Sequence, residues 1–206
     1  VQHREAGEFK KDKLKVLAEL TKLRQICCDP RLHYEDYKAG SAKLDTCMEL
    51  VHGALDGGHR ILLFSQFTGM LDIIGKRLAK EDIAFLKLTG ASSKESRAKM
   101  VAQFQAGEVP VFLISLKAGG VGLNLTAADV VIHYDPWWNV AAQDQATDRA
   151  HRIGQQHTVT VYKLIAKDTI EERIMQMQES KRDLVNSVLG GDGISSALFT
   201  REDVLA

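Results

Sequence analysis

The first sixty residues carry the hydrophobic spacing of two helices. Between residues 13 and 29, apolar side chains recur at i, i+4, i+7 and i+11, which places them on one helical face. Asp29-Pro30 is expected to end this helix, because the residue before a proline avoids the α region. A second helix is expected to start after Ser41, a favourable N-cap, and to stop at Gly57-Gly58. Residues 1–13 are polar and charged, and are expected to be frayed or linker-like.

From residue 60 onward, short apolar runs alternate with helical spacing. The first run, residues 60–65, is continuously apolar and typical of a strand covered on both faces. Further strands are expected at residues 83–88, 109–115 and 130–134, and residues 158–166 alternate enough to be a fifth strand. The helix expected after the first run carries Leu71, Ile74 and Leu78. The helix after the second run is expected to start at the capping box Ser92-Ser93-Lys94-Glu95 and to end at Gly107, and the helix after the fourth run to extend from Asn139 to Arg152, before Gly154. A last helix is expected from the capping box Thr169-Ile170-Glu171-Glu172 to Gly190-Gly191, with an apolar stripe more typical of packing than of a partner groove. Alternating strands and helices predict an α/β fold with a mainly parallel sheet.

Composition excludes several classes of protein. The 206 residues contain 27 Lys and Arg against 27 Asp and Glu, which argues against nucleic-acid binding by bulk charge but not against a local basic track. Three cysteines make no disulfide framework, so a reducing intracellular compartment is expected. Cys27, Cys28 and His33 do not predict a metal site, since adjacent cysteines chelate poorly and no C-x₂-C partner exists. No apolar run approaches the roughly 18 residues of a membrane span, and the polar opening suggests a segment of a longer protein.

Two glycine-containing segments imitate nucleotide-binding loops. Residues 69–77 have five residues between their glycines instead of four, and Arg77 stands where a P-loop needs Ser or Thr to ligate Mg²⁺. Residues 120–125 lack the third glycine of a dinucleotide fingerprint and lead into another strand. No acidic pair ends an apolar strand in the Walker B manner. The chain is therefore not expected to hold Mg-nucleotide by itself in the P-loop manner.

The helix expected from Asn139 carries side chains suited to a polyphosphate. Gln145, Arg149 and Arg152 recur at i, i+4 and i+7, and thus share one helical face. Two arginines near the carboxyl ends of parallel strands suit bidentate phosphate contact, and the glycine-rich loop 117–122 allows a ligand close to the backbone. The alternative is a solvated helix face with internal Asp–Arg pairs.

Three aromatic or imidazole side chains near the fourth apolar run can be interpreted as structural residues as well as functional ones. Trp137 and Trp138 lie in the loop after this run. Such a pair can plug the sheet edge, the interpretation favoured for Trp137, or wedge against nucleic-acid bases or sugars. His133, at the end of the run, is expected to be structural.

In chain order, these segments resemble the motifs of the Swi/Snf-type ATPases, a branch of helicase superfamily two. Motif IV is matched by residues 62–67, the segment after it by 88–93 with Arg97, motif V by 115–128, the connecting Asp-Pro-Trp-Trp-Asn by 135–139 and motif VI by 144–155. Residues 20–33 resemble the helix that leads into the second lobe, and residues 168–180 the C-terminal brace helix. The match runs in order over about residues 13–190.

The resemblance implies the second RecA-like lobe of a two-lobed, ATP-driven motor on double-stranded DNA. By similarity, Arg149 and Arg152 match the arginine fingers that reach across the cleft to the triphosphate, and Gln145 matches the glutamine at the same interface. Gly120, Gly122 and Asn124 match the loop that links nucleotide to DNA. The positions that match DNA-phosphate contacts are Ser65, Gln66, Ser92, Arg97, Ser115 and Lys117, and Trp138 matches a tryptophan against the minor groove. Val140 departs from the family pattern, which usually has proline there.

The implied partners lie mostly outside this chain. ATP with Mg is expected to be held mainly by an N-terminal lobe that carries the P-loop, so the isolated lobe is expected to be inactive. Double-stranded DNA and a DNA-bound protein substrate are the other partners implied, and no membrane is. The expected divisions are a helical lead-in (1–56), the RecA-like lobe (57–167) and the brace helix with its tail (168–206). The alternative function is a non-catalytic RecA-like interaction module, against which the intact Arg149, Arg152 and glycine-rich loop argue.

Overall fold

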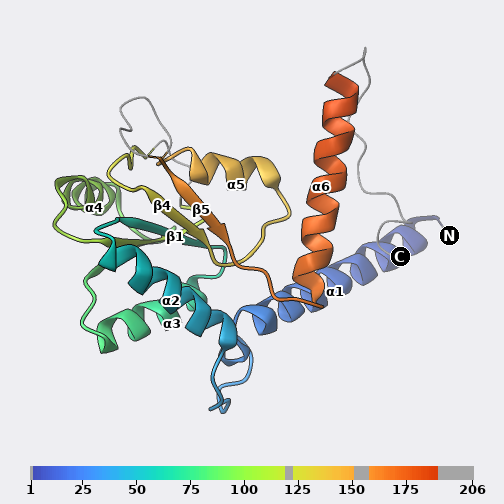
Figure 1. Cartoon of the computed structure of the whole chain (residues 1–206). Helices are drawn as coiled ribbons and strands as arrows, with labels where there is room; N and C mark the ends of the chain where they lie inside the picture. The colour runs from blue at the N-terminus through green and yellow to red at the C-terminus, as the bar shows by residue number, and fades with distance from the viewer. Residues whose placement is uncertain (1, 119–122, 151–157, 190–206) are drawn as a thin grey trace.

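A five-stranded, all-parallel sheet forms the centre of the computed structural model, which describes residues 2–118, 123–150 and 158–189 (Figure 1). The strands are β1 (Ile61–Ser65), β2 (Phe85–Leu88), β3 (Val111–Ser115), β4 (Val130–His133) and β5 (Thr160–Lys163), in the spatial order β2-β3-β1-β4-β5. The helices are α1 (Gln2–Cys28), α2 (Ala42–Asp56), α3 (Thr68–Lys80), α4 (Lys94–Ala106), α5 (Val140–Thr147) and α6 (Ile170–Leu189), with a 3₁₀ turn at Pro30–Leu32. The predicted α/β fold is confirmed.

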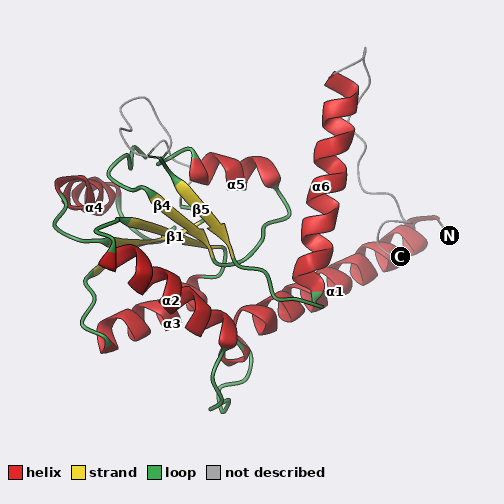
Figure 2. Ribbon diagram, viewed as in Figure 1, coloured by secondary structure: helices red, strands yellow, loops and turns green. Residues whose placement is uncertain are grey.

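Helices cover both faces of the sheet, as the apolar strands require. Successive side chains of a strand point to opposite faces. Ile61 and Leu63 of β1 accordingly pack with α2 and α3, whereas Leu62 and Phe64 pack with Phe104 of α4 and Ala146 of α5. Figure 2 shows α2 and α3 below the sheet and α5 above it. Helices α1 and α6 contact each other and extend away from this layered domain (Figure 1).

Local capping follows the sequence closely. The Ser41 hydroxyl accepts a hydrogen bond from Leu44 N–H at 3.3 Å, which caps α2 as predicted. Gly107 closes α4 in the left-handed conformation, with φ 80°. Asn139 caps α5 through a bond from Ala142 N–H. The N-cap of α4 is Ser93, while the Ser92 hydroxyl accepts from Thr89 N–H. The helix therefore starts one residue later than the expected Ser92–Glu95 capping box required.

Two expectations about helix length are wrong. Helix α1 starts at Gln2, where a linker was expected, because nothing in residues 2–13 forbids continued helical backbone. Helix α5 ends at Thr147 and not at Arg152. The chain tightens there into i→i+3 hydrogen bonds, from Arg149 N–H to Ala146 O and from Ala150 N–H to Thr147 O. Gln145 and Arg149 therefore do not share one helical face, and Arg152 and Gly154 lie outside the described residues.

Candidate functional site

The carboxyl ends of β1, β3 and β4 meet at one edge of the sheet. Parallel pairing places Ser65 beside Ser115, and Phe64 between Ile114 and His133. The segments that follow these strands are thus neighbours although up to about seventy residues separate them in sequence. This is the edge at which parallel α/β sheets bind ligands.

Asp135 is the polar centre of this edge. Its buried carboxylate accepts hydrogen bonds from the Ser65 hydroxyl and the Gln66 side-chain amide, both at 2.5 Å, and from Gln66 N–H at 3.3 Å. Burial raises the pKa of the Asp135 carboxyl, and the two side-chain hydrogen bonds oppose that rise. Ser65 is buried with its hydroxyl turned inward, whereas Gln66 is half-buried. The sequence pattern did not predict that Asp135 accepts these hydrogen bonds from Ser65 and Gln66.

The loop after Asp135 is held by several elements. Pro136 O accepts from the Arg24 guanidinium at 2.8 Å and from Gln66 at 3.3 Å. Trp137 N–H donates to the Gln143 side chain of α5, and Trp137 O accepts from the Gln178 amide of α6. These partners lie far from the loop in sequence, except Gln143, so the pattern around the two tryptophans gave no signal for them.

The two tryptophans have different environments. Trp137 packs against the core cluster on the α4–α5 face, in agreement with the interpretation that it plugs the sheet edge. The Trp138 ring is half-buried, and the Arg24 guanidinium lies 5.3 Å from its centre. Trp138 therefore keeps a partly accessible ring over a buried cation.

Arg97 connects the loops after β2 and β3. Its guanidinium donates to Ser92 O at 3.1 Å, Thr89 O at 3.2 Å and Ala118 O at 3.3 Å. The buried Ser115 hydroxyl accepts from Ala118 N–H at 3.3 Å, whereas the Lys117 side chain is exposed. The structure thus brings Ser92, Arg97, Ser115 and Lys117 to one part of the edge.

The predicted nucleotide-side residues are only partly described. Arg149 is buried, with 4% of its surface exposed, and its carbonyl accepts from Leu125 N–H at 3.0 Å. Asn124 and Gln145 are exposed. Gly120, Gly122 and Arg152 lie outside the described residues. The bond between Leu125 and Arg149 joins the two segments that resemble motifs V and VI.

His133 has the surroundings of a structural residue. Its ring stacks on Phe64 at 5.5 Å, and Nε2 lies 2.9 Å from the Thr147 hydroxyl. Burial lowers the pKa of His133 to about 4, so the ring is neutral at pH 7. Within the described ranges, no group of three or more His, Cys, Asp or Glu side chains could hold a metal ion.

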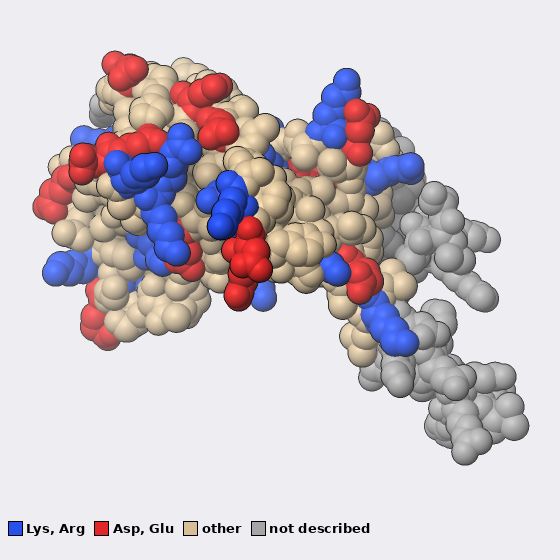
Figure 3. All heavy atoms as spheres, turned by 90° about the horizontal axis from the view of Figure 1, so that it is seen from below, with Lys and Arg blue, Asp and Glu red and all other residues tan. Residues whose placement is uncertain are grey.

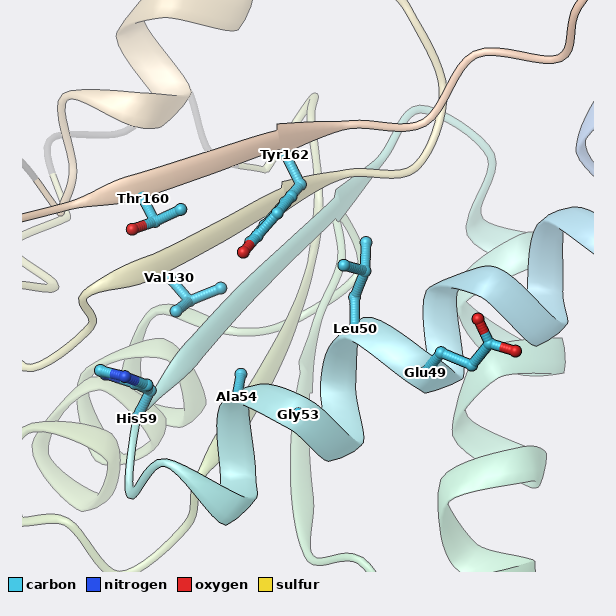
Figure 4. A pocket seen from close by; sticks show the side chains of 8 residues that line it. All are labelled: Glu49, Leu50, Gly53, Ala54, His59, Val130, Thr160 and Tyr162. Atoms are coloured by element: carbon cyan, nitrogen blue, oxygen red, sulfur yellow. The ribbon is translucent and has the colours of Figure 1, made fainter.

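Other parts of the surface do not extend the site. A shallow pocket between α2 and β4–β5 lies at the amino ends of the strands and is lined by Glu49, Leu50, Gly53, Ala54, His59, Val130, Thr160 and Tyr162 (Figure 4). On the face seen in Figure 3, basic and acidic side chains are interspersed. Arg77 pairs with Asp45 and Glu81 on the α2–α3 side, for example. Among the described residues, no helix is both long and apolar enough to cross a membrane.

Comparison with known proteins agrees with this geometry. The family model of the helicase conserved C-terminal domain matches residues 42–154. The chain is 42% identical over 196 residues to an uncharacterized ATP-dependent helicase of Mycoplasma pneumoniae, covering 95% of this chain and 19% of that protein. It is 43% identical over 150 residues to the human chromatin-remodeling ATPase INO80, covering 72% of this chain and 10% of that protein. The chain thus spans at most about a fifth of the length of these curated relatives.

Solved structures show the same relationship. The SWI2/SNF2 ATPase C-terminal domain of Sulfolobus solfataricus is 36% identical and superposes with a TM-score of 0.71, covering 91% of this chain and 75% of that one. The SWI2/SNF2 ATPase core of the same organism, in complex with double-stranded DNA, is 39% identical with a TM-score of 0.73, covering 88% of this chain and 39% of that one. The chain therefore belongs to the helicase conserved C-terminal domain family, as a C-terminal RecA-like lobe of the SWI2/SNF2 ATPase type.

Proposed function

We propose that this lobe is the second motor lobe of an ATP-dependent translocase or remodeller that acts on double-stranded DNA. The observation that carries the proposal is the junction between the segments that resemble motifs V and VI. The segment of Asn124 meets the segment of Arg149 through the hydrogen bond from Leu125 N–H to Arg149 O. Ser115 and Lys117 lie at the start of the stretch that leads to Leu125, so this stretch connects residues assigned to DNA contact with a residue assigned to the nucleotide. The relatives named ATP-dependent helicases and the relative solved with double-stranded DNA support this assignment.

The nucleotide role requires a second body. A first lobe is proposed to hold ATP with Mg, while Arg149 and Arg152 supply positive charge to the γ-phosphate across the cleft, with Gln145 at the same interface. An arginine supplied from another body contributes roughly 10³–10⁵ to the rate of phosphoryl transfer. Because Arg149 is almost fully buried in this lobe, its guanidinium must turn outward to touch a phosphate. Closure of the two lobes would drive this movement of the Arg149 guanidinium, so that ATP hydrolysis would depend on lobe closure.

The DNA role fits a lobe of zero net charge. Gln66, Ser92, Lys117 and Trp138 are half-buried or exposed and can reach a duplex, with Arg97 beside them. Ser65 and Ser115 are buried, so we expect them to act mainly by shaping the loops that face the phosphates. Gly120 and Gly122 complete the loop proposed to link nucleotide and DNA. Phosphate contacts position a protein on DNA without reading its sequence, and few of them imply a modest salt dependence of binding.

Alanine substitutions at the two arginines test the nucleotide role. In the protein that carries both lobes, we expect Arg149→Ala and Arg152→Ala each to lower the DNA-stimulated rate of ATP hydrolysis by roughly 10³-fold or more. The matched control is Arg77→Ala on α3, which removes a surface arginine that pairs only with Asp45 and Glu81 among its described salt bridges. Rates of the two variants within a factor of two of the parent would contradict the assignment. The isolated lobe is expected to show no appreciable hydrolysis.

A further inference from the structure

Arg24 is a buried cation on α1, the helix that extends away from the layered domain, and it contacts the loop that carries Trp137 and Trp138. It belongs to α1, and 5% of its surface is exposed. Its Nη2 donates to Pro136 O at 2.8 Å, across 112 residues of sequence. Its guanidinium carbon lies 5.3 Å from the centre of the Trp138 ring and 5.7 Å from that of Phe67. One side chain thus contacts both the backbone of the loop and its half-buried Trp138 ring.

The energetics favour a fixed geometry at Arg24. Burial lowers the pKa of the guanidinium, and the nearby Asp135 carboxylate opposes this shift. A desolvated arginine gains most from planar stacking on tryptophan together with directed hydrogen bonds. The neighbouring backbone is already tethered, since Gln143 and Gln178 bind the N–H and the carbonyl of Trp137. With that backbone held, the contact with Arg24 can fix the orientation of the Trp138 ring.

We propose that Arg24 is a positioning residue that sets the orientation of the Trp138 ring toward DNA. This inference rests on the proposed function, in which Trp138 lies against the duplex. Arg24 does not touch DNA in this account, because it is buried behind the ring. Arg24 also couples the lead-in helix α1 to the DNA-facing loop, since a shift of α1 would be transmitted to Trp138.

A double-mutant cycle on the protein that carries both lobes tests this role. The measured quantities are the duplex DNA concentration that gives half-maximal stimulation of ATP hydrolysis, and the maximal rate. Arg24→Met is expected to raise the half-saturating concentration by about 3- to 10-fold, in the range of a desolvated cation–π contact, with the maximal rate changed less than about twofold. Trp138→Ala is expected to raise the half-saturating DNA concentration at least as much as Arg24→Met does. In the Trp138→Ala background, Arg24→Met is expected to add less than about a factor of two.

The orientation of the ring needs its own readout. The fluorescence of Trp138 is obtained as the difference between the parent and Trp138→Phe, and its quenching by acrylamide reports the accessibility of the ring. Arg24→Met is expected to increase this quenching without DNA present, because the ring loses its cation–π partner. The matched control is Arg77→Met on α3, which removes a surface arginine that pairs with the partly exposed Asp45 and Glu81 and makes no described contact with the loop. Arg77→Met is expected to leave both readouts at the parent value.

The outcomes separate the two proposals. If Trp138→Ala leaves the half-saturating DNA concentration unchanged, the DNA role of Trp138 fails, while the quenching data still decide whether Arg24 orients the ring. If Trp138→Ala raises that concentration but Arg24→Met changes neither readout, the positioning role is overturned. It is also overturned if Arg24→Met raises the half-saturating concentration by the same factor in the Trp138→Ala background as in the parent. Should Arg24→Met fail to fold, Arg24→Lys keeps the charge and loses the planar guanidinium, and it is expected to give the same shifts with smaller size.

Discussion

The sheet core and the junction are stabilised by opposite chemistry. The sheet core comprises the buried residues of β1, β3 and β4, which are apolar except for Ser65, Ser115 and His133. The junction is the set of buried polar residues that join α1, α2 and α6 to the loop after β4, namely Arg24, Lys43, Tyr134, Asp135 and Glu171. Apolar packing tolerates exchange among residues of similar size, whereas buried charges require their own partners. The comparison indicates that the stability of the layered domain depends on buried apolar area. The attachment of α1 and α6 depends instead on specific pairs of polar or charged side chains.

The ion pair between Lys43 and Glu171 is the centre of the junction. The Lys43 ammonium lies 2.6 and 2.5 Å from the two carboxylate oxygens, and the side chains are 9% and 1% exposed. Glu171 also accepts from Ala166 N–H at 2.7 Å. Lys43 lies over the ring of Tyr134, whose hydroxyl donates to Cys28 O at 3.0 Å. The pair therefore connects α2 to the start of α6, next to the end of α1.

Breaking this pair should have the largest effect. Lys43→Met leaves a buried carboxylate without its countercharge, so we expect it to lower the free energy of unfolding by about 3–5 kcal/mol at pH 8. Burial raises the pKa of the Glu171 carboxyl even with Lys43 present, and the variant raises it further. The loss should therefore shrink as the pH falls through that pKa, because a protonated carboxyl needs no countercharge. Urea unfolding at pH 8 and pH 5 measures both values.

A second substitution controls for lost packing at Lys43. In Lys43→Met with Glu171→Gln, the amide still accepts from Ala166 N–H but carries no charge. The double variant is expected to regain most of the stability lost at pH 8. If it is no more stable than Lys43→Met, the charge of Glu171 is not the cause of the loss.

Leu63→Ala tests the sheet core. Leu63 is fully buried in β1, between Leu113 of β3 and Ile132 of β4. We expect a loss of about 2–5 kcal/mol in the free energy of unfolding, and the same loss at pH 8 and pH 5 because no group with a shifted pKa is removed. A loss that shrinks at pH 5, as expected for Lys43→Met, would erase the distinction between the two regions.

The same distinction explains what the sequence could predict. The five strands and the caps at Ser41, Gly107 and Asn139 depend on local patterns, and the structure contains them. The end of α5 at Thr147 is followed by i→i+3 hydrogen bonds and by the long-range bond from Leu125 N–H to Arg149 O, and no periodicity reveals either. Of the proposed site, motif resemblance supplied the residues, but not Arg24, Asp135 or Gln178, whose contacts span 41 to 112 residues of sequence.

His133 is the exception within the sheet core, because it is a titratable group among apolar side chains. Burial lowers the pKa of His133 to about 4, against an ordinary value of 6.5. Between these two values the unfolded chain binds more protons, so the His133 contribution is fully present above pH 6.5 and is lost as the pH falls toward 4. The expected loss is on the order of 3 kcal/mol.

Unfolding free energies of the parent and of His133→Gln, measured from pH 7 to pH 4, isolate this term. Glutamine keeps a polar atom near Thr147 and does not titrate. The stability advantage of the parent should decrease as the pH falls across this range. An advantage that stays constant would mean that the pKa of His133 in the folded protein is close to its ordinary value.

The smallest expected effects come from two helix caps, one next to the junction and one at the surface of the layered domain. Ser41 lies next to the junction, because its hydroxyl accepts from Leu44 N–H at 3.3 Å and also donates to Cys28 O of α1 at 3.4 Å. Ser93 caps α4 at the surface, accepting from Ser96 N–H at 3.2 Å. We expect Ser93→Ala to cost about 0.5–1 kcal/mol and Ser41→Ala about 1–2 kcal/mol, both within the range for lost N-caps. Chemical unfolding of the two variants side by side measures the difference. Equal losses would mean that the bond to α1 adds nothing, so the junction would depend on its charged pairs and not on its neutral hydrogen bonds.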